Sequence, residues 1–184
     1  MNTFNFRSLF IALAVALPMA ASAPAFAASK ADLESSSKAA LNQLVAQNPG
    51  AKALNAKAVA VLVFPKVTKA GLGVGGQFGE GVLWRKGKAA GYYNTAGASY
   101  GLQAGAQQYG YAMFFMNQKA LDSLSSTQGF EVGVGPSVVV MDEGKAKNIT
   151  SGTLTEDIYA FIFSQKGLMA GLGIQGNKIT KIDK

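Results

Sequence analysis

The 184-residue chain contains no cysteine and no histidine. It therefore lacks disulfides, thiolate nucleophiles, imidazole general bases and the usual ligands of structural zinc and haem. Serine–histidine–aspartate and cysteine–histidine catalysis are excluded for the same reason. Acidic residues are also few, with 10 Asp and Glu against 17 Lys and Arg. This excess of positive charge favours an anionic partner, such as lipid headgroups, nucleic acid or another acidic polymer.

The chain has no apolar run of the ~20 residues that a membrane-spanning helix needs. Near its start, Arg7 precedes an apolar segment at residues 9–16, and Ala25-Phe26-Ala27 forms an A-x-A cleavage site. This arrangement predicts a secretory signal peptide over residues 1–27. The mature protein is then a single domain over residues 28–184, exported to the periplasm or secreted.

The apolar pattern predicts an α+β fold. Apolar side chains recur at helical spacing in residues 30–47, and Asn48-Pro49-Gly50 ends that helix. Residues 59–64 form a continuous apolar run closed by Pro65, typical of a strand covered on both faces. Asn117 is the expected cap of a short helix over residues 117–124.

The remaining segments alternate glycine with apolar or aromatic side chains, and glycines within strands imply bends, bulges or close backbone contacts. The further strands expected are residues 71–75, 102–107, 109–115, 132–134, 137–141, 158–163, 168–174 and 179–182, with a polar connection at 141–145. Together these segments predict a glycine-rich antiparallel β-sheet, barrel-like or a sandwich, with an N-terminal helix and one short internal helix.

Two patterns that resemble catalytic or nucleotide sites have simpler explanations. Gly71-Leu72-Gly73-Val74-Gly75-Gly76 matches G-x-G-x-x-G, but a strand-like segment follows it instead of the helix that a dinucleotide needs. The acid pairs Asp142-Glu143 and Glu156-Asp157 point apart on a turn or strand, which favours solvated charge over catalysis. We therefore predict no catalytic residue, no metal ligand, no cofactor and no enzymatic activity.

Two basic clusters and one tryptophan form the candidate site. The clustered residues are Lys66, Lys69, Arg85, Lys86 and Lys88, and the aromatic residue beside the second cluster is Trp84. If the strands around residues 74 and 82 pair as a hairpin, both clusters lie at one end of the sheet. A cationic rim beside Trp84, with Tyr92 or Tyr93 nearby, is a combination favoured at membrane interfaces. The alternative is a pair of solvated turns, and no nucleic-acid motif accompanies the cluster.

The N-terminal helix has two open interpretations. It lies on a lipid surface with help from Lys30 and Lys38, or its thin, alanine-rich apolar face packs against the sheet.

Several blocks of the sequence resemble the SYLF domain family, in the order found in that family. They are Val63-Phe64-Pro65-Lys66-Val67-Thr68-Lys69-Ala70-Gly71, residues 73–76, residues 79–83, residues 99–107, Val134-Gly135-Pro136 and residues 159–171. The resemblance spans roughly residues 33–179. It implies a phospholipid-binding module, since eukaryotic relatives bind phosphoinositides, fungal ones are also linked to actin, and bacterial ones are small and exported. It also implies membrane contact by the N-terminal helix and, by motif match, by Lys66 and Lys69.

We therefore expect an exported, bacterial, non-enzymatic domain that binds anionic phospholipid or a membrane surface peripherally, with no nucleic-acid partner. The expected lipid-binding residues are Lys66, Lys69, Trp84, Arg85, Lys86, Lys88, Lys30 and Lys38. The alternative is a small outer-membrane β-barrel or an envelope structural protein, because ~8 strands rich in glycine and aromatics fit the length. A hydrolase using carboxylates or a Ser-Lys pair ranks third, and no constellation of residues supports it.

Overall fold

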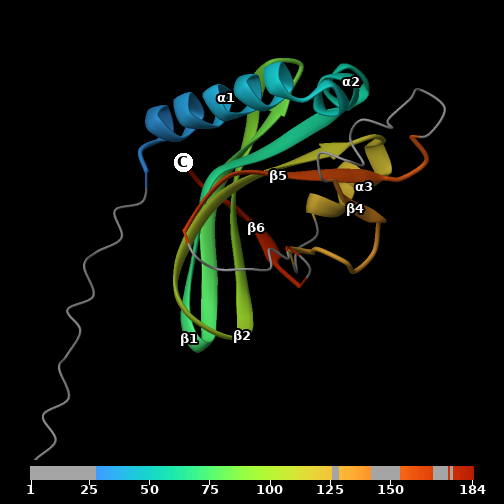
Figure 1. The fold of residues 1–184 in the computed structure, drawn as a ribbon. Coiled ribbons are helices and arrows are strands. Elements are labelled where there is room, and N and C mark those ends of the chain that lie inside the picture. Colours follow the sequence, from blue (N-terminus) through green and yellow to red (C-terminus); the bar gives the residue numbers. More distant parts are fainter. Residues whose placement is uncertain (1–27, 126–128, 142–153, 168–173, 175) are drawn as a thin grey trace, which may run out of the picture.

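The computed structural model describes residues 28–125, 129–141, 154–167, 174 and 176–184. A curled, half-barrel sheet carries two helices across its top, so the fold is α+β (Figure 1). The elements are α1 (Lys30–Gln47), α2 (Pro49–Lys57), β1 (Ala60–Arg85), β2 (Lys88–Phe115), α3 (Gln118–Asp122), a 3-10 turn (Ser123–Ser125), β3 (Phe130–Glu131), β4 (Val138–Met141), β5 (Ile158–Gly167) and β6 (Lys178–Ile182). The expected signal peptide, most of the 141–145 connection and residues 168–173 lie outside the described residues.

Strands β1 and β2 form one long antiparallel ribbon. Lys86 and Gly87 join them with φ angles of 49° and 75°, the left-handed geometry of a tight hairpin turn. The ribbon also folds back on itself, as Figure 1 shows at its lower end. A Cβ atom on Gly71 would lie 2.4 Å from Gly75 Cα, which marks the bend. We call residues 60–70 the first arm of β1 and residues 77–85 its second arm.

The pairing of the strands corrects three expectations. The sheet order is β3-β6-β2-β5-β4 with β1 beside β2, and β4 pairs with β5 in parallel, so a wholly antiparallel sheet is wrong. β1 does not end at Pro65, because a bulge between Phe64 and Val67 accommodates a residue without an N–H. The expected strand at residues 132–134 is wrong too, since β3 ends at Glu131 and Gly133 has a φ of 98°.

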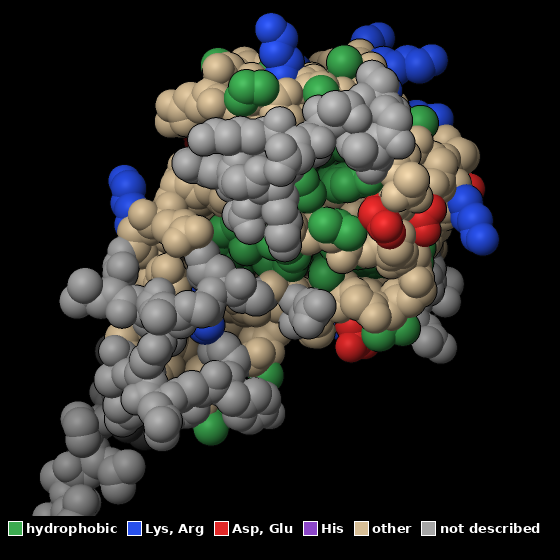
Figure 2. Space-filling view, turned by 45° about the vertical axis from the view of Figure 1, so that its right-hand side comes forward, with side chains coloured by type: hydrophobic (Ala, Val, Ile, Leu, Met, Phe, Trp, Pro, Cys, Tyr) green, Lys and Arg blue, Asp and Glu red, His purple; other side chains and the backbone are tan. Residues whose placement is uncertain are grey.

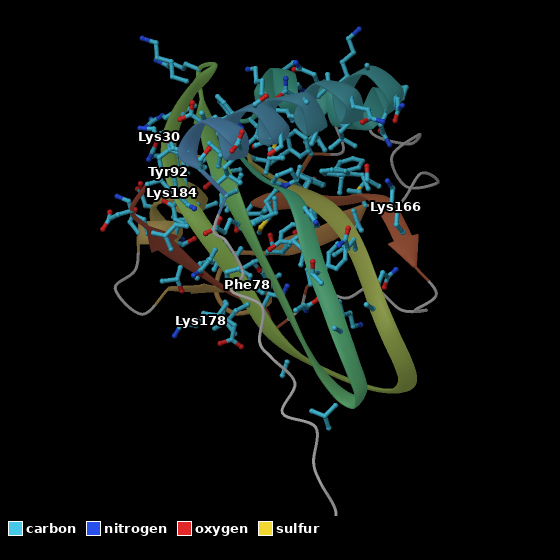
Figure 3. The ribbon with its side chains drawn as sticks, turned by 90° about the vertical axis from the view of Figure 1, so that its left-hand side faces the viewer. Lys30, Phe78, Tyr92, Lys166, Lys178 and Lys184 are labelled. Atoms are coloured by element: carbon cyan, nitrogen blue, oxygen red, sulfur yellow. The ribbon has the colours of Figure 1, made fainter. Side chains whose placement is uncertain are left out.

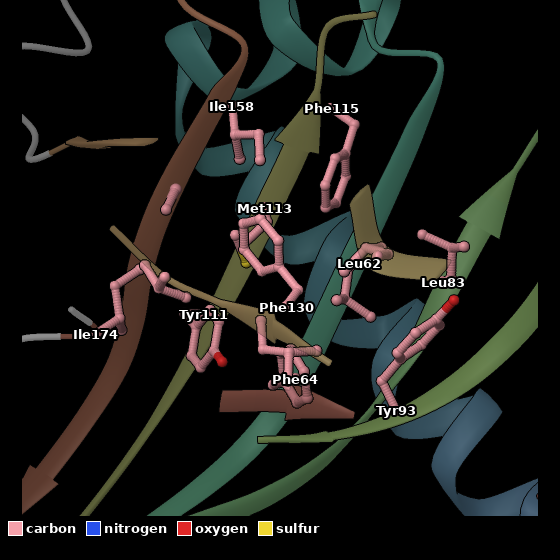
Figure 4. Packing of buried hydrophobic residues seen from close by; sticks show 14 of the residues in the cluster. Leu62, Phe64, Leu83, Tyr93, Tyr111, Met113, Phe115, Phe130, Ile158 and Ile174 are labelled. Carbon is pink, nitrogen blue, oxygen red and sulfur yellow. The ribbon is translucent and has the colours of Figure 1, made fainter. Parts of the chain in front are cut away.

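Side chains of β1 alternate between two hydrophobic clusters. Leu62 and Phe64 lie in an inner cluster, where the Phe64 ring stacks on Tyr111 with centroids 4.6 Å apart (Figure 4). Val61 and Val63 lie in a second cluster on the side of α1. The apolar run at residues 59–64 is therefore covered on both faces, as its composition predicts.

Helix α1 covers the residues expected from the sequence and packs against the sheet. Ser29 caps its start by accepting a 3.2 Å hydrogen bond from the Asp32 N–H. Its buried residues are Leu33, Ser37, Leu41 and Leu44. None of the helices within the described residues has the length and apolar character to cross a membrane.

Helix α3 begins at the predicted cap. The Asn117 side chain accepts a 2.8 Å hydrogen bond from the Ala120 N–H, and Ala120 and Leu121 are buried. This short helix follows β2 after two residues, and its buried side chains belong to the inner cluster.

The inner cluster contains two tyrosine hydroxyls that should ionise at a higher pH than exposed tyrosines. The Tyr109 hydroxyl donates a 2.6 Å hydrogen bond to Gln77 Oε1, and the Tyr111 hydroxyl donates a 2.7 Å bond to Thr95 Oγ1. Burial raises the pKa of Tyr109 to about 12 and also raises the pKa of Tyr111. Both pKa values exceed the unfolded value of ~10, so the stability they confer is complete below pH ~10 and lost as pH rises toward 12.

Urea unfolding should therefore show a lower free energy of unfolding at pH 11 than at pH 8. Ultraviolet titration of the phenols should show a delayed fraction that ionises only as the protein unfolds. Simultaneous ionisation of all the phenols near pH 10 in the folded protein would contradict this assignment.

Candidate functional site

Basic side chains gather where the β1–β2 turn meets the helices. Lys38 of α1 and Arg85 and Lys86 of the turn line a cavity of about 390 Å³, which we call the turn pocket. The side-chain amides of Asn42 and Asn55 add polar groups to its wall. No acidic residue is among the described residues that line it. Lys and Arg side chains stand over the helices at the top of the molecule in Figure 2.

Trp84 lies at the base of this pocket beneath α1. Only 9 % of the residue is exposed, and its indole Nε1 donates a 2.8 Å hydrogen bond to Ser37 Oγ. Lys38 Nζ lies 4.8 Å from the centre of the ring, within the range of a cation–π contact. The expectation of an exposed interfacial tryptophan is therefore wrong, because Trp84 faces the side of the sheet that α1 covers.

The two neighbouring tyrosines are not exposed interfacial residues either. Tyr92 is half-buried, its hydroxyl donates to the Glu34 carboxylate, and Lys30 Nζ lies 5.4 Å from its ring centre (Figure 3). The hydrogen bond to Glu34 is the main reason that the pKa of Tyr92 is raised. Tyr93 points to the opposite face and is 4 % exposed in the inner cluster. The Lys30–Tyr92 and Lys38–Trp84 pairs thus attach α1 to the second arm and to β2.

The two basic clusters do not lie at the same end of the sheet. Residues 74 and 82 belong to one continuous strand, so they cannot pair as separate strands of a hairpin. Lys66 and Lys69 lie within the first arm, whereas Arg85 and Lys86 mark the turn at the end of the second arm. The structure therefore brings Lys38, Trp84, Arg85 and Lys86 together, with Lys88 just after the turn, and separates them from Lys66 and Lys69.

Arg85 is held in place by a neighbour outside the pocket. Its Nη2 donates a 3.0 Å hydrogen bond to Gln118 Oε1 of α3, and the arginine remains exposed. Across the part of the chain that the structure describes, no three acidic side chains come close enough to hold a metal ion. The turn pocket therefore offers cations and amides, which suit binding of an anion.

A second cavity, of about 850 Å³, lies beside α1 and is called the helix groove here. Its apolar lining includes Leu33, Ala39, Ala40, Pro65, Phe78 and Phe163. Phe78 is 51 % exposed and lies below α1 in Figure 3. Sequence reasoning did not identify this groove, since Phe78 stands alone between glycines and the groove walls come from three separate elements.

A comparison with protein families found one matching family model. Residues 96–184 match the family model described as Ysc84, a Las17-binding protein actin regulator, and a search of curated proteins found no match. The description is that of a binding protein. The matched part begins within β2 and includes β3 to β6, so the turn pocket lies outside it. The matched residues, 96–184, agree with the later sequence blocks that resemble the SYLF domain family, at residues 99–107, 134–136 and 159–171.

Proposed function

We propose that this protein binds anionic phospholipid at a membrane surface through the turn pocket, without catalysing a reaction. The observation that carries this proposal is the meeting of Lys38, Arg85 and Lys86 around one cavity whose described lining has no acid. A lipid phosphate supplies the complementary charge, and arginine binds phosphate with two parallel hydrogen bonds. A volume of about 390 Å³ also lies within the range of small-molecule sites.

The mechanism is reversible electrostatic association. Each Lys or Arg near an anionic bilayer contributes about 1 kcal/mol, and this attraction weakens as salt shortens the Debye length. Lys30, at the start of α1, and Lys88, just after the β1–β2 turn, are also exposed and add to the attraction. The matching family model is described as a binding protein, which supports a function in binding and not in catalysis.

The proposal includes the cellular setting. We propose that residues 1–27 direct export and are removed, and that the domain then works in the periplasm or outside the cell as a peripheral membrane protein. The support is the sequence of that segment, with its apolar core and A-x-A site.

Vesicle co-sedimentation with a charge-reversed turn tests the function. The variant R85E/K86E/K88E changes three exposed residues and leaves Lys38 on Trp84, so the core is kept. We expect it to lose about 3 kcal/mol of binding to anionic vesicles, roughly a hundredfold in affinity. Wild-type binding should require anionic lipid and should weaken between low and high salt.

The matched control is K166E/K178E/K181E, which makes the same change in net charge at exposed positions of β5 and β6. Its loss should stay below about tenfold, because β5 and β6 contribute no residue to the turn pocket. Equal losses in the two variants would show that net charge alone drives binding. Salt-independent binding to neutral vesicles would also contradict the proposed site.

A further inference from the structure

We propose that the helix groove is a separate binding site for a single fatty-acid chain, with the carboxylate of the ligand at Lys66. This goes beyond the surface binding proposed above, because it assigns a different cavity and a different ligand. The groove of about 850 Å³ falls within the size range of pockets that enclose small molecules.

The first argument is an exposed aromatic side chain inside an apolar recess. Phe78 of the second arm is 51 % exposed and lines the groove with Leu33 of α1 and Phe163 of β5. Large exposed apolar surface that is concave marks ligand or partner sites in soluble domains. An apolar recess bounded by one helix and two strands suits a flexible alkyl chain.

The charges at the rim select an anion. Lys66 and Glu80 are the charged side chains among the described residues that line the groove. Glu80 is already paired with Lys184, whose Nζ lies 2.9 Å from Glu80 Oε2. Lys66 is exposed, and no ion pair to it is found among the described residues. Among the side chains that line the groove, Lys66 therefore carries the one uncompensated positive charge, which complements one carboxylate.

The groove wall also contains an unusual backbone conformation. Ser164 of β5 lines the groove and has a φ of 51°, a left-handed value that is uncommon for a residue with a side chain. The pairing of β2 with β5 shifts register next to it, between Gln108 and Gly110. Such outliers are concentrated at ligand-binding positions, where the local cost of strain is retained for function.

The groove and the turn pocket are independent, because α1 lies between them. Lys38 and Asn42 line the turn pocket, whereas Ala40 and Gln43 line the groove. At ~3.6 residues per turn these pairs project from opposite flanks of α1. A ligand bound in one cavity therefore does not reach the other without crossing the helix.

This proposal is tested by equilibrium dialysis of dodecanoate. The protein is expressed from Met1 and used in the form that the host cell releases. We expect one saturable site per chain. Affinity should rise by roughly fourfold per methylene from octanoate to dodecanoate. Dodecylamine, which has the same chain but a positive charge, should bind at least tenfold more weakly.

Two variants locate the site. K66E removes the cation, A40W fills the groove, and each should weaken dodecanoate binding at least tenfold. A46W places the same ring at an exposed position of α1 that lines neither cavity, and it should bind within twofold of wild type. Variant R85E/K86E/K88E should also retain dodecanoate binding, which separates a failure of this proposal from a failure of the proposed membrane site.

A measurement on the wild-type protein tests the proposal even if the variants fail to fold. A fatty acid carrying a photoreactive diazirine at its chain end should label the wild-type peptide that contains Phe78. Absence of a saturable site, equal affinity for dodecylamine, or labelling confined to peptides outside the groove would overturn the proposal.

Discussion

Replacing Gly81 with alanine should lower the free energy of unfolding by about 3 kcal/mol, at the upper end of overpacking effects. Gly81 lies where the second arm of β1 crosses the first. A Cβ atom there would stand 2.6 Å from the Val63 carbonyl oxygen and 2.6 Å from Phe64 Cδ1. The carbonyl belongs to a paired strand and Phe64 is fully buried, so neither atom moves aside at low cost.

Urea unfolding followed by tryptophan fluorescence measures this effect, since Trp84 is the single tryptophan and lies in the second arm. Gly76→Ala is the matched control in the same strand. A Cβ atom on Gly76 would meet only the Gly97 carbonyl oxygen, at an ordinary 3.8 Å. We expect that control to stay within about 1 kcal/mol of wild type. Similar losses in the two variants would mean that the arms do not meet at Gly81.

Replacing Trp84 with alanine should cost about 4 kcal/mol of stability. The change removes a buried ring from the cluster beneath α1 and leaves Ser37 Oγ without its indole donor. It also removes the surface on which Lys38 lies. Trp84→Phe keeps most of the ring volume but not the hydrogen bond, so a smaller cost of about 1–2 kcal/mol is expected.

Circular dichroism during urea unfolding measures the stability of both variants, because each substitution removes the only fluorescent tryptophan.

In the wild-type protein, the fluorescence of Trp84 tests whether the indole is buried under α1 when the protein binds vesicles. Its emission should stay nearly unchanged when anionic vesicles are added, and lipids brominated on their acyl chains should quench it weakly. Strong quenching by such lipids would place the indole in the bilayer and would contradict its burial under α1.

The sequence predicts the elements whose boundaries depend on local chemistry. The range of α1 follows from helical spacing and from Asn48-Pro49, which ends one helix and begins the next. The cap at Asn117 and the run at residues 59–64 were predictable for the same reason. Each of these features depends on residues only a few positions apart.

Features that depend on contacts between distant segments were not predictable. Alternation along a strand gives two faces, but it does not say that α1 covers the face of Trp84. Pro65 suggests the end of a strand, because the sequence alone does not show that a bulge accommodates the proline. The separation of Lys66 from Arg85 follows from the folding back of a single strand, whereas the sequence suggests two shorter ones. Phe78 joins a groove only through α1 and β5, which come from opposite ends of the domain.

The long β1–β2 ribbon also determines the order in which the domain can assemble. Pairing begins most easily at Lys86 and Gly87, where the partners are neighbours in sequence, and loop closure costs more toward the Ala60–Phe115 end. The surface that receives α1 combines the first arm, through Val61 and Val63, with the second arm. That surface exists only after the ribbon has formed and folded back. Although α1 precedes the strands in the chain, it therefore docks after them.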